Sequence, residues 1–101
     1  MSYDIIWEFR VPLTRTAQFV EAYASDGPWA QLFRRAPGFI ETRLLQDTED
    51  AGRYLTVDRW ESQAAFEAFK RDFATDYNAL DERLEGLASL EVRLGAFDTN
   101  P

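Results

Sequence analysis

The sequence predicts an α+β domain with the element order βαββαβ, in which helices cover one side of a four-stranded antiparallel sheet. Three observations support this. Four segments alternate apolar and polar side chains with a period of two, as strands do. Apolar side chains recur at helical spacing between the first and second strands and between the third and fourth. A chain of 101 residues has the size of one domain, so residues 1–101 are treated as a single unit with a core at about residues 3–97.

Residues 3–11 form the first predicted strand, and Pro12 ends it. Thr14 or Thr16 can cap the helix that follows, whose apolar side carries Phe19, Val20 and Tyr23. Asp26 is then expected to cap a second short helix with Pro28 in its first turn. The apolar stripe of this short helix consists of Trp29, Leu32 and Phe33.

Two further strands are predicted at residues 39–46 and 54–59, joined by a hairpin loop over the polar residues 47–52. Ser62 is a good cap for the next helical segment, which has about six turns with one apolar face. Thr75 and Asp76 can begin a new helix midway, so two abutting helices are an alternative to one long helix. The last strand covers about residues 89–97.

Helix crossovers between strands of one sheet are right-handed, which places both helical layers on the same side and gives a ferredoxin-like fold. The helix-covered face is expected to carry the apolar set Trp7, Phe9, Ile40, Leu44, Leu55, Val57, Val92 and Leu94. The opposite face is expected to carry Ile6, Glu8, Arg10, Phe39, Glu41, Arg43, Tyr54, Thr56, Asp58, Glu91, Arg93 and Phe97. Because large apolar groups would lie close together there, we expect two copies to pair through this face; a solvated sheet with weak salt bridges is the alternative.

Composition restricts the chemistry. The net charge of -7 disfavours nucleic acid and anionic membranes as partners. The chain has no cysteine and no histidine, which removes thiolate chemistry, imidazole bases and the commonest ligands for zinc and haem iron. The N-terminal residues contain no basic leader followed by an apolar run, and no segment has the length of a membrane span, so a cytoplasmic protein is expected.

Several segments together resemble the antibiotic biosynthesis monooxygenase family of the dimeric α+β barrel superfamily, from about residue 3 to residue 97. The resemblance is carried by residues 35–39 (Arg-Ala-Pro-Gly-Phe), 54–62 (Tyr-Leu-Thr-Val-Asp-Arg-Trp-Glu-Ser), 65–69 (Ala-Phe-Glu-Ala-Phe) and 93–95 (Arg-Leu-Gly). Each segment alone occurs widely, but their order and spacing are specific for the fold. They are not specific for an activity, because the family includes cofactor-independent oxygenases, haem-degrading enzymes and members of unknown function.

The resemblance implies that Trp60 is the tryptophan that lines the cavity between sheet and helices in family members. Haem-degrading members add a histidine about three helical turns later and an asparagine on the first strand. Here Lys70 stands near the first position and residues 5–9 contain no asparagine, so the resemblance does not predict haem oxygenation. Quinone-forming members carry an asparagine on the third strand, where this chain has Thr56 and Asp58.

Cofactor-independent oxygenation needs a base, hydrogen bonds or a cation near the developing anion, and exclusion of water. The predicted catalytic residues are Trp60, Asp58 as a base if burial raises its pKa, and Arg43, with Arg59 a further available cation. The predicted ligand-binding residues are Trp29, Tyr54, Tyr77 and Phe66. Each has a structural alternative: Trp60 as a plug, Trp29, Tyr23 and Tyr77 as core, and Arg43, Asp58 and Arg93 as interfacial charges. The acidic residues of the long helix, including Asp81, are expected to form a solvated face.

The sequence therefore predicts a homodimer that binds a small aromatic or polyketide-like molecule and oxidises it without metal, haem or another cofactor. The high density of aromatic residues favours this hypothesis. A non-catalytic, homodimeric, small-molecule-binding or stress-associated protein with the same barrel is the alternative.

Overall fold

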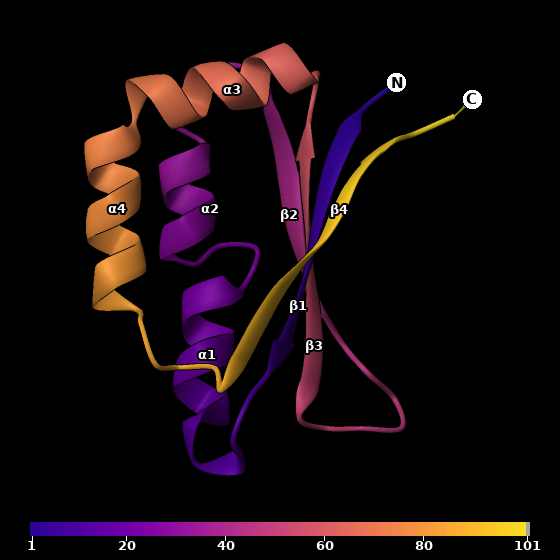
Figure 1. The fold of residues 1–101 in the computed structure, drawn as a ribbon, viewed down its shortest axis with the longest axis vertical. Helices are drawn as coiled ribbons and strands as arrows, with labels where there is room; N and C mark the ends of the chain where they lie inside the picture. Colours follow the sequence, from indigo (N-terminus) through magenta and orange to yellow (C-terminus); the bar gives the residue numbers. More distant parts are fainter. Residues whose placement is uncertain (101) are drawn as a thin grey trace.

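A computed structural model describes residues 1–100 of the chain. Its sheet contains β1 (Tyr3–Arg10), β2 (Phe39–Gln46), β3 (Arg53–Trp60) and β4 (Leu90–Asp98). The strands lie in the order β2-β3-β1-β4, and every neighbouring pair is antiparallel. All helices lie on one side of the sheet, so the predicted ferredoxin-like α+β fold is confirmed (Figure 1).

The crossover between β1 and β2 contains a short 3-10 turn (Leu13–Arg15), α1 (Thr16–Tyr23) and α2 (Pro28–Phe33). Neither threonine caps α1, because Thr16 is its first residue and its hydroxyl donates to the carbonyl of Pro12. Asp26 does not cap α2 either, because Gly27 occupies the cap position and no side chain caps the helix. Pro28 does stand in the first turn, where a missing N–H is tolerated.

The crossover between β3 and β4 contains α3 (Gln63–Asp72) and α4 (Ala74–Arg83), so the alternative of two abutting helices is correct. Ser62 caps α3 as predicted, because its hydroxyl accepts the N–H of Ala65 at 3.1 Å. The break falls at Phe73, whose φ of -116° and ψ of 23° leave the helical region. As a result α3 crosses the end of the sheet while α4 runs alongside α2 (Figure 1).

The expected assignment of side chains to the two faces of β3 is wrong. Tyr54 and Thr56 are only 3% and 4% exposed and point toward the helices with Asp58, whereas Leu55 and Val57 lie on the other face. The reason is the period of two, since Trp60 is fully buried beneath the helices and fixes the direction of every second residue before it.

The neighbouring strands show related corrections. On β2 a bulge between Phe39 and Glu41 leaves Ile40 exposed and turns Thr42 toward the helices, and Phe39 packs in the core instead of on the opposite face. On β4, Glu91 and Arg93 lie opposite Phe9 and Trp7, on the helix side, whereas Val92 and Leu94 are exposed. The predictions for Trp7, Phe9 and Leu44 are confirmed.

The open face, the side of the sheet away from the helices, combines ion pairs with uncovered apolar groups. Arg53 bonds Glu8 at 2.6 Å and Asp47 at 3.2 Å, and Arg59 bonds Glu41 at 3.1 Å and Asp4 at 3.3 Å. Exposed apolar side chains of the edge strands lie beside these pairs: Leu45, Leu90, Val92 and Phe97. Because of these exposed apolar side chains, partial burial of the open face is more favourable than its full exposure to water.

One corner joins the start of β2 to the start of α3. Gly38 has a φ of 89°, and a Cβ at this position would lie 2.6 Å from the Cβ of Ala65. Its carbonyl accepts the N–H of Glu61 at 2.7 Å. Only glycine therefore fits this corner, since both the backbone conformation and the contact exclude a side chain.

Candidate functional site

A cavity lies between the helix-covered face of the sheet and the helices. Every strand and the helices α1, α2 and α4 contribute to its lining: Trp7, Phe9, Tyr23, Trp29, Phe33, Thr42, Thr56, Asp58, Tyr77, Asp81 and Glu91. The free space between its walls, including the open mouth, is about 430 Å³, and about 40 Å³ of it is open to the centre of a water molecule. The cavity is thus a narrow, largely aromatic slot, which suits a flat ligand.

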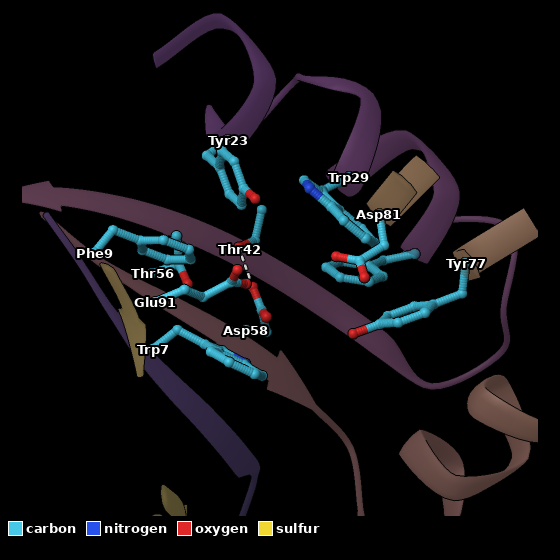
Figure 2. A pocket seen from close by; sticks show the side chains of 11 residues that line it. Trp7, Phe9, Tyr23, Trp29, Thr42, Thr56, Asp58, Tyr77, Asp81 and Glu91 are labelled. Carbon is cyan, nitrogen blue, oxygen red and sulfur yellow. Dashed lines mark hydrogen bonds between the residues drawn. The ribbon is translucent and has the colours of Figure 1, made fainter. Parts of the chain in front are cut away.

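Asp58 is the carboxylate on the floor of this cavity (Figure 2). The strand β3 places it beneath the helices, and the hydroxyl of Thr42 on the paired strand β2 donates a hydrogen bond to its Oδ1. Removal of water from around the carboxylate raises the pKa of Asp58 to about 6, and the Thr42 hydrogen bond opposes this shift. Asp58 is therefore largely ionised at neutral pH yet basic enough to accept a proton from a bound molecule.

Neutral hydrogen-bond donors face the cavity from the helices. Burial raises the pKa of Tyr23 and of Tyr77, with nearby carboxylates acting in the same direction, so both phenols keep their protons at neutral pH. Trp29 is only 8% exposed, and its indole N–H makes no hydrogen bond of regular geometry, although it lies close enough to the Tyr23 hydroxyl to oppose the rise in the pKa of that phenol. In Figure 2 these three side chains come from α1, α2 and α4 and stand across the slot from Asp58.

Two further carboxylates stand at the rim. Asp81 on α4 and Glu91 on β4 border both the slot and a neighbouring polar hollow at the start of β4. Burial and the charge of Asp81 raise the pKa of Glu91. None of the ion pairs formed by residues 1–100 includes Asp58, Asp81 or Glu91. The prediction that Asp81 belongs to a solvated helix face is therefore incomplete, because this residue is exposed but also borders the slot.

The structure brings three of the predicted site residues together, namely Asp58, Trp29 and Tyr77. Trp60 does not line the cavity: it is fully buried behind Phe33, with 5.7 Å between the two ring centroids. Trp60 therefore has the position expected from its structural alternative, in which it plugs the junction between β3 and α3.

Tyr54 and Phe66 also lie outside the lining. Tyr54 is buried against Phe19 in a separate part of the core, and its hydroxyl bonds Gln46 at 3.1 Å. Phe66 packs between Tyr3 and Trp60. Both side chains support the walls of the fold without facing the slot.

Arg43 is placed on the opposite side of the sheet from the cavity. It lies across from Val57 on β3, its side chain is 63% exposed, and its Nε donates to Glu41 at 3.0 Å. Arg59 lies on the same open face. Neither arginine therefore lines this cavity, because β2 and β3 direct them away from the helices, and the assignment of Arg43 to catalysis stays a prediction.

Sequence reasoning missed Thr42, Asp81 and Glu91 as lining residues. The alternation of side chains along β3 could have identified Thr42. A buried Trp60 implies that Asp58 and Thr56 also face the helices, and the antiparallel pairing of β2 with β3 then places Thr42 opposite Asp58 on the same face. Asp81 and Glu91 depend on how α4 sits against β4, which periodicity alone does not specify.

Within residues 1–100, no three acidic side chains are grouped so that they could hold a metal ion. None of the helices in this range combines the length and apolar character needed to cross a bilayer.

Residues 3–72 match the family model described as antibiotic biosynthesis monooxygenase. The chain belongs to this family. The matched region ends with α3, but similarity to solved structures extends over the whole fold. No curated protein sequence is similar enough to add to these relatives.

Three solved structures illustrate the likeness. A variant of MhuD with two manganese protoporphyrin IX molecules bound per active site is 26% identical, with a TM-score of 0.73 over 96% of this chain and 93% of that one. A variant of SnoaB, a cofactor-independent oxygenase from Streptomyces nogalater, is 20% identical. The alignment has a TM-score of 0.66 and covers 99% of this chain and 94% of SnoaB. A monooxygenase from Streptomyces coelicolor, in complex with nanaomycin D, is 21% identical. The alignment has a TM-score of 0.68 and covers 99% of this chain and 88% of that monooxygenase.

Proposed function

We propose that this member of the antibiotic biosynthesis monooxygenase family is a cofactor-independent monooxygenase that acts on a small aromatic or polyketide-like molecule. The substrate would occupy the slot between the sheet and the helices α1, α2 and α4. A single observation carries the proposal: the carboxylate of Asp58 lies on the floor of an aromatic cavity, with its pKa raised to about 6. A base with a pKa close to neutrality can take a proton from a bound phenol or enol efficiently.

The donors across the slot complete this chemistry. When Asp58 takes the proton, negative charge develops on the oxygen of the substrate. The hydroxyls of Tyr23 and Tyr77 and the unpartnered N–H of Trp29 can donate hydrogen bonds to that oxygen. These donors are neutral, so they would perform the task that sequence reasoning assigned to an arginine.

The electron-rich anion then reduces dioxygen directly. For a substrate with a reactive methylene group, one oxygen atom becomes the carbonyl of the product and the other leaves as water with the two hydrogens of the methylene. The balance CH₂ + O₂ → C=O + H₂O requires no external reductant. The protein supplies the base, the hydrogen bonds and a site with little water.

Two structural neighbours support the proposal, since SnoaB is a cofactor-independent oxygenase and the Streptomyces coelicolor monooxygenase is seen with nanaomycin D. MhuD, by contrast, is seen with manganese protoporphyrin IX. This chain contains neither histidine nor cysteine, two common axial ligands of haem iron. The residues present therefore do not fit a haem group bound by either ligand.

We propose further that the protein is a homodimer in which a second copy covers the open face. The exposed side chains of Leu45 (45%), Val92 (38%) and Phe97 (51%) on the edge strands support this pairing. The surrounding carboxylates and arginines could form additional pairs across the interface.

Oxygen uptake with a panel of anthrone-like and hydroquinone substrates tests the proposed activity. The wild type should consume oxygen, and its rate should rise with pH through about 6 as Asp58 ionises. Asp58→Asn should lower the rate by about a hundredfold or more, because the base is lost while the shape is kept.

Asp26→Asn is the matched control, since this exposed carboxylate lies in the loop before α2 and should leave the rate unchanged. Binding of aromatic ligands without oxygen uptake would instead favour a non-catalytic binding protein. An unchanged rate in Asp58→Asn would rule out the assignment of the base.

A further inference from the structure

The lining of the slot offers a ligand two kinds of polar group. Trp29 presents a buried N–H that makes no hydrogen bond of regular geometry, a state that an acceptor on a ligand would relieve. At the rim, Asp81 and Glu91 present carboxylates that no basic side chain pairs. The described lining contains no lysine or arginine at all.

The carboxylates affect one another. Asp81 acts together with burial to raise the pKa of Glu91, and both rim carboxylates contribute to the raised pKa of Tyr77. Lys70 is one cation whose charge Asp81 affects, since the Asp81 carboxylate opposes the lowering of the Lys70 pKa by burial, but the Lys70 Nζ lies over the ring of Tyr77, 3.5 Å from the centroid, and it does not border the slot. Asp81 and Glu91 thus form no ion pair within residues 1–100, and Arg93, exposed on the same side of β4, pairs with neither of them.

A metal ion would not satisfy this arrangement. Divalent cations need several oxygen ligands around one point, and the acidic side chains of residues 1–100 form no such group. An organic ammonium group fits better, because it can approach separate carboxylates and also lie against aromatic faces such as those of Tyr77 and Trp29.

We infer that the substrate is an aromatic molecule that carries an oxygen acceptor, bound by Trp29, and a protonated amine, bound by Asp81 and Glu91. This inference rests on the proposed function, because it names the substrate class of the same cavity. The acidic rim discriminates against carboxylated aromatics of the same size, since a third negative charge there would be repelled.

Three probes of nearly equal size isolate the charge: tyramine is cationic, 4-(2-hydroxyethyl)phenol is neutral and 4-hydroxyphenylacetate is anionic. Isothermal titration at pH 7.5 and low salt should show tyramine binding about fivefold more tightly than the neutral phenol, as expected for two partly exposed carboxylates. The anion should bind more weakly than the neutral phenol. Added salt should reduce the preference for the amine.

The isosteric double variant Asp81→Asn/Glu91→Gln should reduce the preference for tyramine to about twofold or less and leave the affinity for the neutral phenol unchanged. Glu82→Gln is the matched control, since this exposed residue of α4 does not line the slot and should keep the full preference.

Equal binding of tyramine and the neutral phenol by the wild type would overturn the amine inference while leaving the aromatic site and the proposed function in place. A preference that survives in the double variant would overturn the roles of Asp81 and Glu91. Failure of all three probes to bind would overturn both the inference and the proposed function.

Discussion

The two faces of the sheet reverse the usual relation between burial and polarity. The face beneath the helices carries Thr42, Thr56 and Asp58 at its centre, where a simple core would be apolar. The open face carries Leu55 and Val57 on the same strand β3, where a solvated surface would be polar. The polar groups of the covered face surround a cavity, and the apolar groups of the open face lie where a second subunit is proposed.

The contrast supports the proposals made for the two faces, a bound ligand on the covered face and a second subunit on the open face. Buried polar groups are retained in proteins when they are hydrogen-bonded or when they serve a ligand, and Thr42 and Asp58 are hydrogen-bonded to each other and line the cavity. Uncovered apolar side chains beside ion pairs are typical of a surface that associates. Substitutions on the two faces should therefore have different consequences.

The largest effect is expected at the open face. Phe97→Asp or Leu45→Asp would place an unpaired charge in the proposed interface and should raise the dissociation constant of the dimer by about a hundredfold or more. Sedimentation velocity at micromolar concentration measures this shift. Leu13→Asp is the control, because Leu13 is 87% exposed in the 3-10 turn and should not change association. A wild-type monomer at these concentrations would contradict the proposed dimer.

A smaller effect is expected from the pH dependence of stability. The pKa of Asp58 is about 6 in the folded protein against an ordinary value of 3.8, so the folded state binds the proton more tightly. Stability should therefore fall as pH rises from about 4 to about 6, and the full penalty should be present above pH 6. Two pKa units correspond to about 3 kcal/mol.

Asp58→Asn removes this penalty, because the amide resembles the protonated acid and can still accept the Thr42 hydrogen bond. The variant should match the wild type near pH 4 and exceed its free energy of unfolding by up to about 3 kcal/mol near pH 7. Urea unfolding at several pH values, at one protein concentration, gives the difference. A difference that stays constant with pH would show that Asp58 is not desolvated.

The smallest effect is expected from Arg43→Ala. The Arg43 side chain is 63% exposed and pairs with Glu41 on its own strand, so its loss should change the free energy of unfolding by less than about 1 kcal/mol. Because Arg43 lies on the open face, oxygen uptake should stay within about twofold of the wild-type rate. A loss comparable with that of Asp58→Asn would place Arg43 in the catalytic machinery, as the sequence suggested.

The sequence was sufficient for the order of elements because local signals mark them: alternation in the strands, Pro12 and the polar hairpin at residues 47–52 as breaks, and Ser62 as a helix cap. It failed for the direction of side chains in β3, because Leu55 and Val57 made the wrong face look like the core. An amphipathic pattern identifies the inner face only when the outer face is solvated.

The sequence predicted part of the candidate site. Asp58, Trp29 and Tyr77 were selected by residue type and by the resemblance, and the fold does bring them together. Trp60 was assigned to the cavity because of the resemblance, but Phe33 stands between its ring and the slot. Whether a buried side chain reaches the cavity depends on the distances between the helices and strands, and these distances follow from packing that involves the whole chain.

The Gly38 corner has a consequence for the width of the slot. Ala65 sits against Gly38 with no room for a larger group, so the first turn of α3 is held at a fixed height above the end of the sheet. The same helix carries Phe69, which packs edge-on against Phe33 with centroids 5.2 Å apart, and Phe33 forms part of the slot wall. One extra methyl group at position 38 would push the start of α3 away from the sheet, and the contact between Phe69 and Phe33 would pass this displacement on to the wall of the slot. The width of the slot is thus set partly by a glycine that does not line it.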